Sequence, residues 1–166
     1  MPTQSQAQHN KALMQEIFEA VGRGDTRLFT AHLAHDAKMT ITGEYSWSQV
    51  FEGKEAIIEL FRYVRSRLIE RGRTHAFHFL ADDDWVVIEA RGDMTTLSGL
   101  PYRNHYCLLY RLKDDLIVEI KEYQDSVMGE RLLGPCPPQL RATAPAHVAA
   151  LANSRCEELE SRSSAL

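Results

Sequence analysis

The chain has 166 residues, of which 44% are hydrophobic and 25% are charged. This composition suits one globular domain with a sizeable core, and it excludes a fibrous or disordered chain. The formal net charge of -4 argues against a nucleic-acid partner or an anionic membrane surface, because both require clustered positive charge.

No stretch has the continuous apolar run of a signal peptide or of a membrane span. The three cysteines, Cys107, Cys136 and Cys156, lie far apart and form no paired motif for zinc or redox chemistry. We therefore expect a soluble, cytoplasmic protein with reduced thiols, without a nucleic-acid or membrane partner.

Three helices are predicted in the first half of the chain. Apolar residues recur at helical spacing in the stretch NKALMQEIFEAVG, and a short helix is predicted over residues 26–34. A longer helix is predicted from Gly53 to near Gly72. Between the second and third helices, residues 37–43 favour a β-strand, which leads into the aromatic loop EYSWSQVFEG.

The second half is rich in Val, Ile, Tyr and Thr, and it predicts strands over residues 74–81, 84–97, 101–112 and 116–125. Short connections make neighbouring strands antiparallel. The predicted fold class is α+β, with a curved antiparallel sheet wrapped by three helices around a cone-shaped cavity. We assign residues 1–134 to this domain and residues 135–166 to a proline-rich segment and tail, with room for one extra helix.

The stretch EARGDMTT places an arginine and an aspartate on one strand face. The Cα atoms of Arg91 and Asp93 should lie roughly 7 Å apart in an extended strand. If that face is concave, the two side chains share a pocket whose low polarity strengthens their interaction and shifts the pKa of the carboxylate. The same alternation, counted along the last strand, puts Tyr123 and Asp125 on one face with Ile117.

A family resemblance is carried by the motifs VVIEARG, PYRNHYCLLYRLKDDLIVEIKEYQD and FEGKEAI. They resemble the SnoaL-like, ketosteroid-isomerase-related branch of the nuclear transport factor 2-like superfamily, over most of residues 8–134. The resemblance implies the cone-shaped fold, chemistry without a cofactor, and a homodimer formed by paired sheets. The outward row that contains Leu109 would supply apolar contacts to this dimer.

One relative in this superfamily, limonene-epoxide hydrolase, carries Arg-x-Asp on the equivalent strand and a second Asp at the end of the last strand. By that resemblance Asp125 would activate water, Asp93 would protonate the substrate oxygen, and Arg91 would keep the two carboxyl groups in different protonation states. Thr40 and Thr42 stand where that enzyme has a Tyr and an Asn. In SnoaL-type polyketide cyclases an Asp at the end of the last strand catalyses ring closure, which again matches Asp125.

The candidate catalytic residues are therefore Arg91, Asp93 and Asp125, and no metal site is expected. The expected substrate contacts are Trp47, Tyr102, Asn104, Tyr123, Thr40 and Thr42. Alternatives remain open for the catalytic set. Arg91 and Asp93 could form an exposed ion pair of little energetic weight, and Asp125 could cap the turn that follows it.

Two functional hypotheses follow. The first is a cofactor-free acid/base enzyme that acts on a small, largely apolar metabolite by epoxide hydrolysis, isomerisation or polyketide-type cyclisation. The second is a non-catalytic small-molecule-binding or accessory protein with the same cavity, because the first-strand partners of the epoxide hydrolase are missing. In both, the partners are a small molecule and a second copy of the chain.

Overall fold

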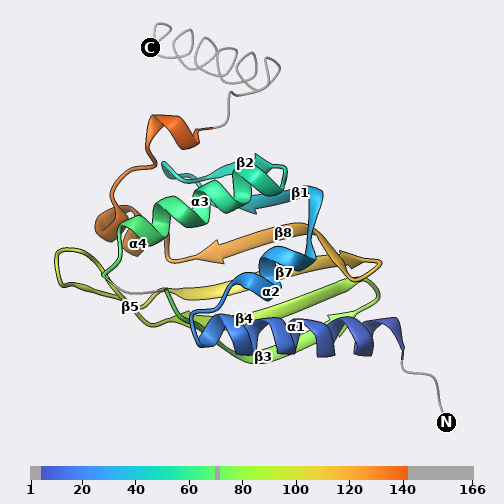
Figure 1. Ribbon diagram of the computed structural model, residues 1–166. Coiled ribbons are helices and arrows are strands. Elements are labelled where there is room, and N and C mark those ends of the chain that lie inside the picture. The colour runs from blue at the N-terminus through green and yellow to red at the C-terminus, as the bar shows by residue number, and fades with distance from the viewer. Residues whose placement is uncertain (1–4, 70–71, 142–166) are drawn as a thin grey trace, which may run out of the picture.

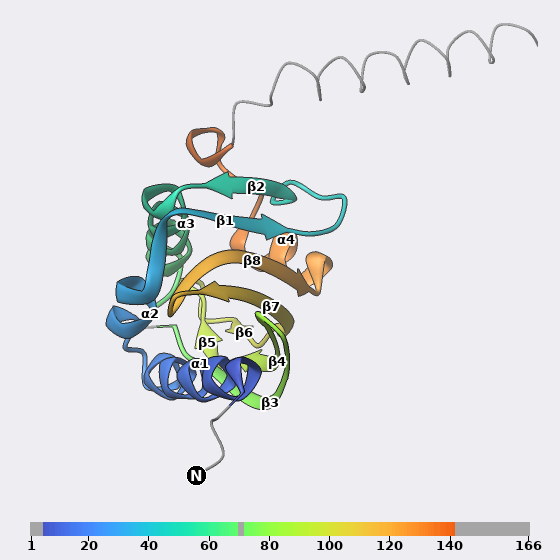
Figure 2. The same cartoon turned by 90° about the vertical axis from the view of Figure 1, so that its right-hand side faces the viewer.

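The computed structural model describes residues 5–69 and 72–141. Three helices precede most of the sheet: α1 (Gln6–Gly22), α2 (Arg27–His32) and α3 (Lys54–Ser66). The strands are β1 (Leu33–Ile41), β2 (Gln49–Glu52), β3 (Thr74–Asp82), β4 (Trp85–Gly92), β5 (Met94–Thr95), β6 (Pro101–Tyr102), β7 (His105–Lys113) and β8 (Leu116–Gln124). Figures 1 and 2 show the helices on the concave side of a strongly curved sheet. The predicted α+β fold is confirmed.

The main sheet has six strands in the order β2-β1-β8-β7-β4-β3, and β5 and β6 form a separate small hairpin. All neighbouring strands in the main sheet are antiparallel except β1 and β8, which run parallel. The sheet is therefore mixed, not wholly antiparallel as predicted. Short turns dictate direction only between consecutive strands, and β1 and β8 are not consecutive in the chain.

The helices place apolar stripes against the sheet. At the start of α1, the Ser5 hydroxyl accepts a hydrogen bond from the Gln8 amide, while the Gln8 side chain accepts one from the Ser5 amide. Met14 of α1 and Ile57 of α3 are fully buried. α3 ends at Ser66, before the predicted end near Gly72, and the chain then forms a β-bridge between Leu68 and Thr96.

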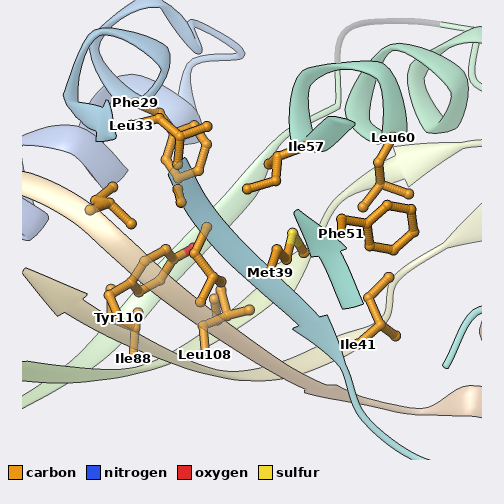
Figure 3. Packing of buried hydrophobic residues seen from close by; sticks show 14 of the residues in the cluster. Phe29, Leu33, Met39, Ile41, Phe51, Ile57, Leu60, Ile88, Leu108 and Tyr110 are labelled. Atoms are coloured by element: carbon orange, nitrogen blue, oxygen red, sulfur yellow. The ribbon is translucent and has the colours of Figure 1, made fainter. Parts of the chain in front are cut away.

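The core lies between the helices and the concave face of the sheet. Figure 3 shows side chains from α2 and α3 meeting side chains from β1, β2, β4 and β7 in one cluster. Phe18 of α1 and Phe29 of α2 pack edge-on against Tyr110 of β7, with ring centroids 5.7 and 6.4 Å apart. Such edge-to-face pairs stabilise the fold beyond simple burial. They hold α1 and α2 over the same part of the sheet.

The chain beyond β8 continues to pack on the domain. It forms α4 (Ser126–Leu133) and a short 3-10 helix, η1 (Pro138–Leu140). Cys136 and Leu140 are buried in the core cluster. Packing therefore continues past residue 134, where the sequence predicts the end of the compact domain. The extra helix predicted in the tail lies outside the described residues.

Candidate active site

A cavity of about 490 Å³ lies between the helices and the concave face of the sheet. Its wall is mainly apolar and combines side chains from the helices with side chains from the sheet. Apolar and aromatic members of this wall include Phe18, Phe29, Met39, Trp47, Leu68 and Tyr102. Concave apolar sites of this size with a few polar groups are typical of small-molecule binding.

Glu122 is the one carboxylic acid among the described residues that line this cavity. It lies on β8 opposite Leu108 of β7, and both side chains point inward. The side chain is partly buried and borders the mainly apolar cavity, and this environment disfavours its charged form. Burial raises the pKa of Glu122 to about 7. A carboxyl group with this pKa can accept or donate a proton near neutral pH.

Two tyrosines of β7 flank this acid. Tyr106 and Tyr110 are the inward residues on either side of Leu108. Burial raises the pKa of both phenols, and the nearby charge of Glu122 raises it further. The phenols therefore stay protonated at physiological pH and can donate hydrogen bonds to an oxygen atom in the cavity.

A hydrogen-bond network holds the polar end of the cavity. The buried Asn104 donates from Nδ2 to Gln124 Oε1 at 2.8 Å and to the Asp125 carbonyl oxygen at 3.0 Å. Its Oδ1 accepts a hydrogen bond from the Asp125 amide at 3.0 Å. Gln124 Nε2 donates to the Tyr45 hydroxyl at 2.7 Å, and the Tyr102 hydroxyl lies 3.4 Å from Gln124 Oε1. These bonds satisfy the buried amides and hold the end of β8 in one orientation.

Arg91 and Asp93 lie on the outer face of the sheet. Both side chains are exposed, whereas the alternate residues Ile88 and Ala90 of β4 are buried. Asp93 forms an ion pair at 3.5 Å with Arg103, not with Arg91. The expectation that Arg91 and Asp93 share the cavity is wrong, because the apolar row of this strand faces the core. A surface ion pair exists here, with a different arginine.

Asp125 follows β8 and caps α4. Its Oδ1 accepts a hydrogen bond from the Met128 amide at 3.0 Å, and the residue is exposed. The alternative interpretation of Asp125 as a cap is confirmed. The residue is not part of the cavity wall. Arg91, Asp93 and Asp125 therefore do not converge, and the catalytic roles inferred for them lose their geometric basis.

Two of the six expected substrate contacts line the cavity. They are Trp47, which is 3% exposed, and Tyr102, which is 2% exposed. The Trp47 indole Nε1 donates a hydrogen bond to the Gly134 carbonyl oxygen at 2.8 Å, which fixes the ring in the wall. Asn104 lies behind the wall and acts through the network described above.

The other three expected contacts do not line the cavity. Thr40 alternates with Met39 and Ile41, which point inward, so its own side chain faces outward. The Thr42 hydroxyl donates to a backbone carbonyl oxygen of β8 at 2.9 Å. Tyr123 is 48% exposed. These placements correct the sequence-based expectation for Thr40, Thr42 and Tyr123.

Sequence reasoning misses Glu122 because of a register shift. Strict alternation from Ile117 would put Ile117 and Ile120 on opposite faces, yet both are buried. The β7–β8 register shifts between Arg111 and Leu112, so the alternation restarts and Glu122 points inward. The signal in the sequence is an acid placed opposite the inward aromatic row of β7.

Within residues 5–69 and 72–141, no group of three or more His, Cys, Asp or Glu side chains is arranged to hold a metal ion. In this same part of the chain, no helix is both long and apolar enough to cross a membrane. The polar groups offered to a ligand in the cavity are carboxyl, amide, hydroxyl and guanidinium groups.

The curved sheet, the covering helices and the cavity between them define a nuclear transport factor 2-like fold. Within this class, the chain belongs to the SnoaL-like domain family, whose sequence model matches residues 14–120. No curated protein matches the chain in sequence.

Several solved structures share the fold. Bal32a from a soil-derived mobile gene cassette has a TM-score of 0.68 and 18% identity, over 78% of this chain and 99% of that chain. A nuclear transport factor 2-like protein from Burkholderia pseudomallei has a TM-score of 0.65 and 21% identity, over 75% of this chain and 96% of that chain. A proposed SnoaL-like polyketide cyclase from Jannaschia sp. CCS1 has a TM-score of 0.65 and 14% identity, over 82% of this chain and 100% of that chain.

Proposed function

We propose that the chain is an acid/base enzyme that transfers a proton on a small, largely apolar molecule bound in the cavity. The observation that carries this proposal is Glu122, an acid set in an apolar cavity with a pKa of about 7. Perturbed acids in clefts are typical of catalytic sites. The similarity to a proposed polyketide cyclase supports the same class of chemistry.

The site suits proton removal next to a carbonyl group. The Glu122 carboxylate takes the proton, the C–H bond breaks, and its electron pair forms an enolate. Hydrogen bonds from Tyr106 and Tyr110 stabilise the negative enolate oxygen. If the proton returns at another carbon, the substrate is isomerised. If the enolate carbon attacks a second carbonyl and the proton passes to the new alkoxide, a ring closes.

Epoxide hydrolysis fits this site less well. The mechanism inferred from the Arg-x-Asp resemblance needs one ionised and one protonated carboxyl group beside the substrate. Among the described residues, the cavity wall supplies Glu122 alone. We therefore propose isomerisation or cyclisation in preference to epoxide opening.

Deuterium exchange tests the proposal without knowledge of the natural substrate. 2-Tetralone is a compact apolar ketone, and exchange of its α-hydrogens in D2O can be followed by NMR. We expect the protein to accelerate this exchange and Glu122→Gln to abolish the acceleration. Asp125→Asn is the matched control, because it removes an acid outside the cavity and keeps a capping side chain. Equal exchange by Glu122→Gln and the unaltered protein would contradict the proposal.

Binding without turnover is the second candidate function, and the mainly apolar cavity wall favours it. A ligand that binds the folded state raises the melting temperature of the protein. If 2-tetralone stabilises the protein and its α-hydrogens exchange at the background rate, the cavity binds but does not catalyse.

We also propose that a second copy of the chain covers the outer face of the sheet. Phe77 and Leu80 on this side are 66% and 57% exposed. Nearby, the charged groups of Arg111 and Lys121 lie 5.8 and 5.1 Å from the centroid of the Trp85 ring. An apolar area rimmed by charge is typical of a protein interface. Light scattering should give about twice the mass of one chain, which is 18.9 kDa. A single species with the mass of one chain would contradict the dimer.

We also propose that the protein acts in the cytoplasm. Both described cysteines, Cys107 and Cys136, are free thiols. Reduced cysteines fit a reducing compartment. Secretion of the native protein into an oxidising compartment, observed by fractionation of its source cells, would contradict this placement.

A further inference from the structure

The cavity opens between α2 and the last turns of α3. Four of the residues that line the cavity are exposed to solvent, and they mark its mouth: Thr26, Phe61, Arg62 and Arg65. The remaining lining residues are buried or partly buried. Phe61 packs edge-on against Phe29 of α2, with ring centroids 5.7 Å apart, so the two helices meet at this mouth. Figure 2 shows α2 and α3 on the same side of the sheet.

Two positive charges lie at this mouth. Arg62 forms an ion pair with Glu59 on the same helix. Arg65 lies one turn further along and has no ion pair with a carboxylate of the described residues. A basic residue in the last turn stabilises a helix by its interaction with the helix dipole, whatever the direction of its side chain. That general effect does not explain why both arginines belong to the cavity wall.

The inner end of the cavity has a different character. Its polar groups are Glu122, Gln124 and the phenols of β7, and Glu122 is the sole acid among the described lining residues. Glu59 offsets the charge of Arg62 at the mouth, and Arg65 has no carboxylate partner among the described residues, so the mouth keeps a net positive charge although the whole chain carries a formal net charge of -4. A positive mouth around an apolar cavity attracts and orients a molecule that has an apolar body and one anionic end.

We propose that the substrate is an amphipathic organic anion, whose charged group binds Arg65 and Arg62 while its apolar body fills the cavity towards Glu122. This inference rests on the proposed function only in taking the cavity as the substrate site. The anionic group of the substrate gives Arg65 an ion-pair partner that it lacks among the described residues. Because this group is held at the mouth, the rest of the molecule, with its carbonyl group, extends inward towards Glu122. Carboxylates and phosphate esters share the chemistry that a guanidinium group recognises.

Three probes with one common body test this inference: 2-naphthylacetate, 2-naphthyl phosphate and the neutral 2-naphthaleneethanol. Their affinities are measured by isothermal titration. At least one anion should bind about fivefold tighter than the alcohol, because charge-assisted hydrogen bonds strengthen binding while solvent screens the exposed arginines. The ratio between the two anions distinguishes a carboxylate from a phosphate ester as the natural charged group.

Variants locate the charge effect. Arg65→Gln, and Arg62→Gln combined with it, should remove the preference for the anions and leave the alcohol affinity within about twofold. Lys54→Gln is the control, since it removes one positive charge from the other end of α3, outside the cavity wall. The inference is overturned if the alcohol binds as tightly as both anions, if no probe binds, or if the preference survives the double substitution.

The same experiment separates this inference from the proposed chemistry. Glu122→Gln should keep the preference for anions, because it leaves the mouth unchanged. If the preference is present but 2-tetralone shows no exchange, the mouth binds anions and the proposed catalysis fails. If Glu122-dependent exchange is present without any preference, the catalysis stands and the anionic substrate is overturned.

Discussion

Replacement of Glu122 by Gln should change how the stability of the protein depends on pH. Glu122 has a pKa of about 7 in the folded protein, against an ordinary value of 4.5. Below pH 4.5 the group is protonated in both the folded and the unfolded state, so it adds no pH dependence. Between about 4.5 and 7 the unfolded chain loses this proton while the folded protein keeps it. The free energy of unfolding therefore falls as pH rises through this window.

The size of this effect follows from the two pKa values. At about 1.4 kcal/mol for each pH unit, the difference between 4.5 and about 7 corresponds to about 3 kcal/mol. Above pH 7 both states are ionised and the loss is complete. The amide introduced by Glu122→Gln cannot ionise, so the substituted protein should lack this loss and gain about 3 kcal/mol relative to the unaltered protein between pH 4.5 and 8.

Urea denaturation at several values between pH 4.5 and 8 measures this gain. The difference in the free energy of unfolding between the two proteins at one pH removes the contribution of the other titrating groups. The change of this difference with pH removes any constant effect of the amide. Glu119→Gln is the control, because it removes an acid of the same strand that pairs with Arg111 at 3.2 Å on the outer side. It should not gain stability at pH 8. Parallel stability curves for Glu122→Gln and the unaltered protein would refute the reasoning.

Substitutions at four of the predicted residues test their placement. Asp125→Ala should destabilise the protein by about 1 kcal/mol through loss of the α4 cap, whereas Asp125→Asn should be nearly neutral in denaturation. Asn104→Ala should cost about 2 kcal/mol, because it removes the 2.8 Å donor to Gln124 Oε1 and the acceptor of the Asp125 backbone amide. A cost near zero would show that these hydrogen bonds do not stabilise the fold. Replacing both Arg91 and Asp93 by Ala should change 2-tetralone exchange by less than about twofold, since surface pairs contribute little, and a large loss of exchange would restore them to the site.

Much of the fold follows from local patterns in the sequence. The apolar spacing around Met14 and Ile17 predicts α1. Alternation along the strand predicted over residues 101–112 puts every second side chain on one face, in the row Tyr102, Asn104, Tyr106, Leu108 and Tyr110. The structure confirms this row, because these residues are buried or line the cavity. Parallel pairing of β1 with β8 depends on contacts far apart in the sequence, so no local pattern predicts it.

The site is harder to predict because it depends on which face of each strand is concave. In β4 the apolar row Val86, Ile88 and Ala90 faces the core, and this could have been recognised from hydrophobicity alone. In β8 the register shift breaks the simple alternation of faces, so Ile117 and Glu122 both point inward although they are five residues apart. The pKa of Glu122 depends on the burial that the whole fold creates around it. Neither the register shift nor the raised pKa can be predicted from the residues that are adjacent in the sequence.

Direct titration of the Glu122 carboxyl carbon by NMR tests the central claim, namely that the cavity holds an acid poised to exchange a proton near neutral pH. The signal can be assigned by its absence from the spectrum of Glu122→Gln. We expect a midpoint near pH 7 for this carbon in the free protein. A midpoint near 4.5, the ordinary value for a solvated glutamate, would contradict it.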